Sequence, residues 1–184
     1  MADLSGKVAL VTGAGQGVGQ GIALALAAAG ARVAVTGRTL AKLDQTSALI
    51  AERGGEALPI EGNVKDPASL ADMVARTAER FGGLDILVNN AQEVPNGKLL
   101  DVTDEAFLAG FESGPLASFR LMKLAHPLMV ARGGGVIVNL ASSAGIRWEK
   151  RKVRSRLASA RPEARRRERF VLPSEWPVWT RGMP

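Results

Sequence analysis

The sequence predicts an α/β fold, a doubly wound parallel sheet of about five strands in the order 3-2-1-4-5. Two observations carry this prediction. Short runs rich in Val, Ile and Leu alternate with helix-forming segments through residues 1–146, as in successive βαβ units. Several of these runs are apolar without polar alternation, which is typical of strands that helices cover on both faces.

Five strands and the helices between them follow from this alternation. Strands are expected at the apolar runs Lys7–Thr12, Ala31–Thr36, Ala57–Glu61, Leu84–Asn89 and Val136–Leu140. Helices are expected between them at Gly17–Ala29, about 40–53, about 67–81 and about 103–131.

The expected helix ends rest on capping and breaking residues. Gly30 supplies a stop for the first helix. Thr39 can cap the second helix, and Asp66, which a proline follows, can cap the third. The long fourth segment contains Pro115 and Pro127, which should bend or subdivide it.

Composition excludes several classes of protein. The 184 residues contain no cysteine and a single histidine, so neither a disulfide framework nor a His/Cys zinc site can form, and no metal is expected. No run approaches the about 18 apolar residues of a membrane span, and the N-terminus lacks the pattern of a signal peptide. The sequence therefore predicts a cytoplasmic protein without membrane contact.

The charge divides the chain into two predicted regions. Residues 1–146 hold 12 Lys/Arg against 14 Asp/Glu, whereas residues 147–184 hold 12 against 4. We therefore expect a folded domain at 1–146 and a basic, irregular, disordered tail at 147–184. Such a tail can be a solvated appendage, a nucleic-acid-binding segment or an out-of-frame translation. The abrupt loss of periodicity after about Arg147 favours the out-of-frame reading over nucleic-acid binding.

A glycine-rich turn carries the strongest functional signal. The first strand runs into Thr12–Gly19 (TGAGQGVG), and a helix follows at once. Glycines let backbone N–H groups approach a pyrophosphate, and the helix N-terminus adds the positive end of its dipole. Although a tight βα turn needs glycine too, the strand before and the helix after favour a Rossmann-like nucleotide site.

Four motifs in order resemble those of the short-chain dehydrogenase/reductase family. They are the T-G-x-x-x-G-x-G turn, Asn63-Val64 after the third strand, Asn89-Asn90-Ala91 at the end of the fourth, and Asn139-x-x-Ser142-x-x-Gly145 at the end of the fifth. The resemblance covers residues 3–146. It implies hydride transfer between a nicotinamide cofactor and a small-molecule carbonyl/alcohol pair. Members of the family form homo-oligomers, an expectation that is weaker for this chain because the family's later segments are not recognisable in it.

The resemblance also implies roles for individual residues. Those expected beside the pyrophosphate are Gly13, Gln16, Gly17, Val18 and Gly19. Asn63 and Val64 would flank the adenine, and the expected supports of the ribose side and the sheet are Asn89, Asn90 and Ala91. Ser142 would polarise the substrate carbonyl, although a serine after a strand can equally serve a turn.

The end of the second strand bears on the choice of cofactor. An acidic residue there would bind a ribose 2′-hydroxyl, whereas an arginine would pair with a 2′-phosphate. The chain reads Thr36-Gly37-Arg38, which favours NADP, with NAD possible because Arg38 can also be an exposed residue at a helix start.

Three departures from the family pattern bear on catalysis. The chain has no tyrosine, and Ser155 and Ser159 stand near the positions where the family's Tyr-x-x-x-Lys is due. No asparagine occurs at Ser113-Gly114, and Gln92 replaces the expected glycine. We therefore expect a catalytically defective chain; the alternative is a non-catalytic nucleotide-binding module whose basic tail binds nucleic acid.

Overall fold

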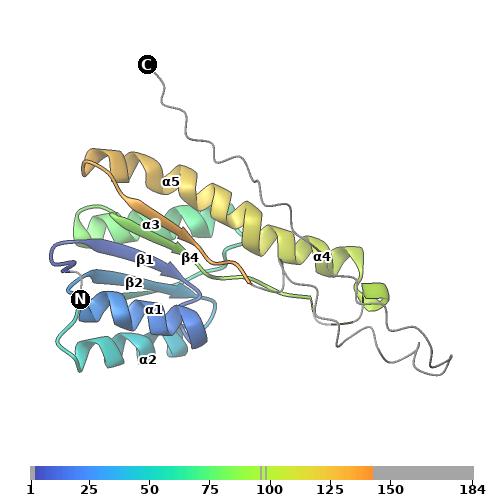
Figure 1. Cartoon of the computed structure of the whole chain (residues 1–184), viewed down its shortest axis with the longest axis horizontal. Coiled ribbons are helices and arrows are strands. Elements are labelled where there is room, and N and C mark those ends of the chain that lie inside the picture. The colour runs from blue at the N-terminus through green and yellow to red at the C-terminus, as the bar shows by residue number, and fades with distance from the viewer. Residues whose placement is uncertain (1–2, 96, 98, 143–184) are drawn as a thin grey trace, which may run out of the picture. The chain divides into compact units, whose positions relative to one another are not determined.

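The computed structural model describes residues 3–95, 97 and 99–142. They form a five-stranded parallel sheet in the order β3-β2-β1-β4-β5, with helices on both faces (Figure 1). The predicted fold class and strand order are confirmed. The tail predicted at 147–184, including Ser155 and Ser159, lies outside the described residues.

The observed elements follow the predicted alternation closely. The strands are β1 (Val8–Thr12), β2 (Arg32–Gly37), β3 (Ala57–Glu61), β4 (Ile86–Asn89) and β5 (Val136–Asn139). The α-helices are α1 (Gly17–Ala28), α2 (Leu40–Ala51), α3 (Pro67–Phe81), α4 (Asp104–Phe111) and α5 (Ala117–Ala131). A short 3₁₀ helix, η1, spans Leu99–Asp101, and a π-helical turn, η2, spans Glu112–Leu116.

Two apolar cores lie on the opposite faces of the sheet. On one face Val8 and Leu10 of β1 pack with Met73 and Phe81 of α3 and with residues of α5. On the other face Ala9 and Val11 of β1 and Val33 and Val35 of β2 pack with α1 and α2. Because consecutive residues of a strand point to opposite faces, a strand between two cores must be apolar throughout.

Two prolines and two cap residues bear on where the helices begin and end. Pro115 lies in the π-helical turn between α4 and α5, so it subdivides the long segment as predicted. Pro127 lies inside α5 without ending it. Thr39 occupies the N-cap position of α2, but its side chain makes no capping hydrogen bond, in contrast to Asp66 at the N-terminus of α3.

Candidate functional site

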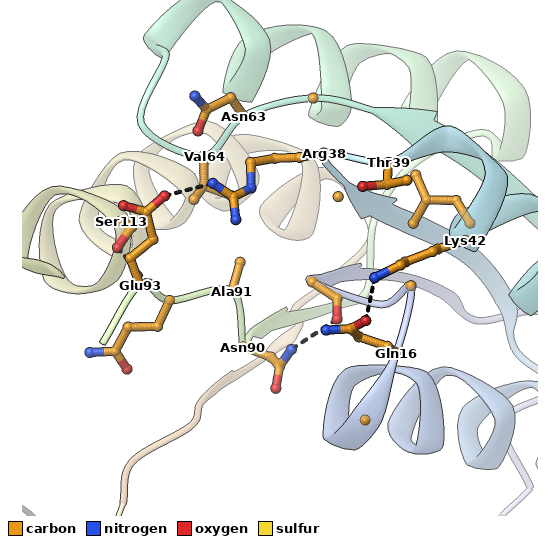
Figure 2. A pocket seen from close by; sticks show the side chains of 17 residues that line it. Gln16, Arg38, Thr39, Lys42, Asn63, Val64, Asn90, Ala91, Glu93 and Ser113 are labelled. Carbon is orange, nitrogen blue, oxygen red and sulfur yellow. Dashed lines mark hydrogen bonds and ion pairs between the residues drawn. The ribbon is translucent and has the colours of Figure 1, made fainter. Parts of the chain in front are cut away.

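A cavity of about 360 Å³ opens at the carboxyl edge of the sheet (Figure 2). Its walls come from the turn after β1, from the ends of β2 and β3, and from the segment after β4. In this topology the strand order reverses beside β1, and the crevice at that point is the usual ligand site of doubly wound sheets.

The glycine turn presents backbone to the cavity. Gly13 and Gly17 have backbone φ angles of +65° and +60°, which residues other than glycine rarely adopt. A Cβ built on Gly17 meets no atom within 4 Å, so this backbone faces open space. Gln16 is the N-cap of α1, but its side chain makes no capping hydrogen bond, so the first N–H groups of α1 are not bonded by it.

A hydroxyl and an amide tie the glycine turn to the end of β4. Thr12 Oγ1 accepts hydrogen bonds from the backbone N–H groups of Asn90 and Ala91, both at 3.0 Å, and donates to the Val88 carbonyl at 3.3 Å. The Asn90 amide donates back to the carbonyls of Thr12 at 2.8 Å and Gly13 at 3.3 Å. The floor of the cavity is therefore a cross-linked polar network.

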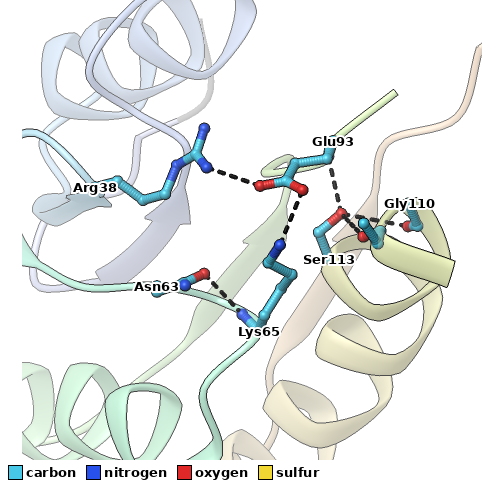
Figure 3. Close-up of polar contacts among 7 residues, drawn as sticks. Arg38, Asn63, Lys65, Glu93, Gly110 and Ser113 are labelled. Carbon is cyan, nitrogen blue, oxygen red and sulfur yellow. Dashed lines mark hydrogen bonds and ion pairs between the residues drawn. The ribbon is translucent and has the colours of Figure 1, made fainter. Parts of the chain in front are cut away.

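Charged side chains stand at the mouth of the cavity. Glu93 bridges two cations, with 2.7 Å from its Oε1 to Arg38 Nη1 and 3.0 Å from its Oε2 to Lys65 Nζ (Figure 3). Lys42 Nζ donates to Gln16 Oε1 at 2.6 Å. The cations come from the segments after β2 and β3, and the single bridging anion comes from the segment after β4.

Most residues predicted to bind the cofactor lie at this cavity. Those that line it are Gly13, Gln16, Gly17, Arg38, Asn63, Val64, Asn90 and Ala91. Three others do not line it: Val18 is 66% exposed, Gly19 packs against Asn90 and the Gly13 carbonyl, and Asn89 is buried and donates to Asn139 Oδ1 at 2.7 Å. Ser142 is exposed, just beyond β5, and is not among the lining residues.

Lys42, Ser113 and Glu93 are among the lining residues that were not expected there. Lys42 lies in the first turn of α2, soon after Arg38 in the chain, so the sequence could have suggested its place at the cavity. Ser113 is buried in the π-helical turn, where its hydroxyl accepts from the Glu93 N–H at 2.8 Å and donates to the Ala109 carbonyl at 2.8 Å. Glu93 lies in irregular chain, and no periodicity in the sequence indicates its position.

Two kinds of feature are absent from the described residues. Within 3–95, 97 and 99–142 no group of three or more His, Asp or Glu side chains is arranged to hold a metal ion. No helix in the same part of the chain is long and apolar enough to cross a membrane.

A parallel sheet in this order, with helices on both faces and a glycine turn at its carboxyl edge, defines a Rossmann-like α/β protein. The family model described as short chain dehydrogenase matches residues 7–153. The chain belongs to the short-chain dehydrogenase family, as the motifs predicted.

Similar proteins cover the same part of the chain. An uncharacterized oxidoreductase of Thermotoga maritima is 42% identical over 144 residues, which is 78% of this chain and 57% of that protein. Galactitol 2-dehydrogenase of Agrobacterium fabrum is 38% identical over 147 residues, 79% of this chain and 56% of that protein. This chain therefore spans little more than half the length of these relatives.

Solved structures agree with this assignment. The structure of 7α-hydroxysteroid dehydrogenase, in complex with NADH and 7-oxo glycochenodeoxycholic acid, is 32% identical, with a TM-score of 0.76. The match covers 80% of this chain and 57% of that one. A short-chain type dehydrogenase/reductase from Mycobacterium marinum is 39% identical, also with a TM-score of 0.76, over 80% of this chain and 60% of that one.

Proposed function

We propose that residues 1–146 bind a nicotinamide dinucleotide, NADP(H) in preference to NAD(H). We further propose that the intact activity of this domain is hydride transfer between that cofactor and a carbonyl/secondary alcohol pair. The observation that carries the proposal is the cavity at the carboxyl edge of the sheet, where the open backbone of Gly17 lies at the start of α1 and Arg38 stands at the mouth.

The chemistry of the cavity fits such a cofactor. The glycine turn and the N-terminus of α1 would hold the pyrophosphate, because both present N–H donors to an anion. Asn63 and Val64 would flank the adenine, and Asn90 and Ala91 would support the adjoining ribose. The guanidinium of Arg38 would pair with a ribose 2′-phosphate, and Lys42, in the first turn of α2, also lines the cavity.

Catalysis is proposed to be defective in the polypeptide as written. The bound dinucleotide would supply the hydride, and Ser142 would hold the substrate oxygen, but a group must also exchange the proton. The 184 residues contain no tyrosine to do so. Loss of a positioned acid/base costs about 10²–10⁴-fold in rate, so turnover should be very slow even where dinucleotide binding is intact.

Equilibrium titration with the two dinucleotides tests the cofactor assignment. The wild-type chain should bind NADP⁺ more tightly than NAD⁺, and Arg38→Asp should reverse this order because it exchanges a phosphate partner for a hydroxyl acceptor. Equal affinity of the wild type for both would contradict the role of Arg38. Salt-dependent binding of duplex DNA without any dinucleotide binding would instead favour the nucleic-acid-binding alternative.

A further inference from the structure

Glu93 neutralises the cation that the proposed function assigns to the 2′-phosphate. Its carboxylate contacts Arg38 at 2.7 Å and Lys65 at 3.0 Å (Figure 3). One anion therefore joins the segment that follows β2 to the segment that follows β3. A phosphate on the ribose would seek the same guanidinium face, because both groups are oxyanions that accept charge-assisted hydrogen bonds from Arg. Glu93 and such a phosphate are therefore competitors for Arg38.

The position of Glu93 is held by the fold. Its backbone N–H donates to Ser113 Oγ at 2.8 Å, and that hydroxyl is itself anchored by the Ala109 carbonyl in the last turn of α4. Ser113 is buried, with 2% exposure. The carboxylate is thus presented to Arg38 from a fixed point of the chain, whereas the side chain of Arg38 is 66% exposed and adjustable.

We propose that Glu93 is a specificity-determining residue that competes with the 2′-phosphate for Arg38 and so weakens the preference of this site for NADP over NAD. The proposal rests on the proposed function. Binding of a 2′-phosphate requires Arg38 to leave Glu93, so the apparent affinity equals the intrinsic affinity multiplied by the fraction of molecules in which the bridge is open. A ligand with a free 2′-hydroxyl does not need Arg38 and is not subject to this loss.

Two small probes isolate the effect without any turnover: adenosine 2′,5′-bisphosphate, which carries the 2′-phosphate, and adenosine 5′-phosphate, which lacks it. Calorimetric titration should show that Glu93→Gln binds the bisphosphate about fivefold more tightly than the wild type, at the upper end of what a partly exposed ion pair is worth. Affinity for adenosine 5′-phosphate should be unchanged. Glu79→Gln, an exposed position on α3, removes the same charge away from the cavity and should alter neither affinity.

A double-mutant cycle ties the effect to Arg38. In an Arg38→Gln background, Glu93→Gln should no longer change the affinity ratio of the two probes, because the contested cation is gone. Thermal unfolding of each variant checks that the fold is retained, and Glu93→Asp, which keeps the charge on a shorter stem, should keep the wild-type ratio more nearly than Glu93→Gln does.

The outcomes separate this inference from the proposed function. Binding of both probes by the wild type with an unchanged ratio in Glu93→Gln would overturn the competition alone. A fall in affinity for adenosine 5′-phosphate in Glu93→Gln would also overturn it, since Glu93 would then be an acceptor for the 2′-hydroxyl. Failure of wild type and variant alike to bind either probe would overturn the proposed function and this inference together.

Discussion

The Asp85 carboxylate lies at the edge of the sheet opposite the cavity, just before β4, and is buried with 3% exposure. It accepts hydrogen bonds from the Val8 N–H at 2.8 Å and from Arg132 Nε at 2.9 Å, and Lys7 Nζ lies 3.6 Å away. Burial alone would raise the pKa of Asp85. The hydrogen bonds from Arg132 and Val8 and the charges of Arg132 and Lys7 outweigh burial, so the pKa lies below its ordinary value.

This arrangement predicts a pH dependence of folding. A carboxyl group whose pKa is lowered on folding stabilises the protein above its unfolded pKa, about 3.9, and that stability is lost as the pH falls through the folded pKa. We expect Asp85→Asn to lower the free energy of unfolding by about 2 to 3 kcal/mol at pH 7, because Arg132 is left without its partner. The variant should also lose less stability than the wild type as the pH falls. Urea unfolding at a series of pH values from about 2 to about 7, which includes the ordinary Asp pKa of about 3.9, measures both effects.

An exposed ion pair provides the matched control for Asp85. Asp72 pairs with Arg76 one turn along α3 at 3.5 Å, and both side chains are about half exposed. Asp72→Asn should change stability by no more than about 0.5 kcal/mol. Equal losses in the two variants would mean that burial of Asp85 has no energetic consequence.

Two glycines of α1 should respond to alanine in opposite directions. A Cβ on Gly19 would collide with the Gly13 carbonyl and the Asn90 amide, which belong to the network under the cavity. Gly19→Ala should therefore cost about 1–3 kcal/mol, as overpacking does. A Cβ on Gly21 meets nothing within 4 Å, so Gly21→Ala should stabilise α1 by about 1 kcal/mol. Urea midpoints that moved in the same direction would contradict this.

At the scale of elements, the caps of α2 and α3 provide a comparison within one molecule. Asp66 accepts from the N–H groups of Ala68 at 3.1 Å and Ser69 at 3.2 Å, whereas Thr39 makes no such bond. Asp66→Ala should cost about 1 kcal/mol, and Thr39→Ala should cost far less. Denaturant unfolding of the two variants measures both losses of stability. Equal losses would mean that the capping hydrogen bond of Asp66 does not stabilise the start of α3.

The elements were predictable because each depends on nearby residues. Apolar runs bounded by glycine gave the strands, and Asp66 with its following proline gave the start of α3. The glycine turn could be assigned to a nucleotide site because a strand and a helix flank it in sequence.

The charged mouth of the cavity was not predictable by the same reasoning. Arg38, Lys65 and Glu93 follow three different strands, and the bonds at Glu93 join residues 28 and 55 positions apart. No local pattern marks an acidic residue in irregular chain as the partner of a distant arginine. The π-helical turn that orients Ser113 is likewise a product of packing, with Pro115 as its only visible sign in the sequence.

At the scale of the whole molecule, β5 leaves apolar surface in contact with water. Val136, Ile137 and Val138 are 58%, 36% and 41% exposed, so neither face of this strand is well covered, and among the described residues β5 pairs only with β4. Exposed apolar strand edges promote association between chains. We expect the chain to self-associate and to show marginal stability, measured by light scattering and thermal unfolding.

Substitutions on β5 test this expectation. Val136→Lys combined with Val138→Lys should restore a monomer, because charged edge strands resist pairing. Val94→Lys combined with Leu100→Lys adds the same charge at two exposed positions outside β5 and should not. A wild-type chain that is already a clean monomer with a sharp, reversible transition would refute the prediction.

The two cores also determine how β1 finds its place in the sheet. In a strand with one solvent-exposed face, the alternation of polar and apolar residues specifies the register of pairing. Both faces of β1 are buried, so this signal is missing. Side-chain size remains as a discriminator: Leu10 points to the face of α3 and α5 with its large side chains, and Ala9 to the alanine-rich face of α1. A slip by one residue would drive Leu10 into the tighter space and leave a void behind Ala9. The central strand is therefore aligned by volume, and exchanging the residues at positions 9 and 10 should disturb its alignment although the composition of the core stays the same.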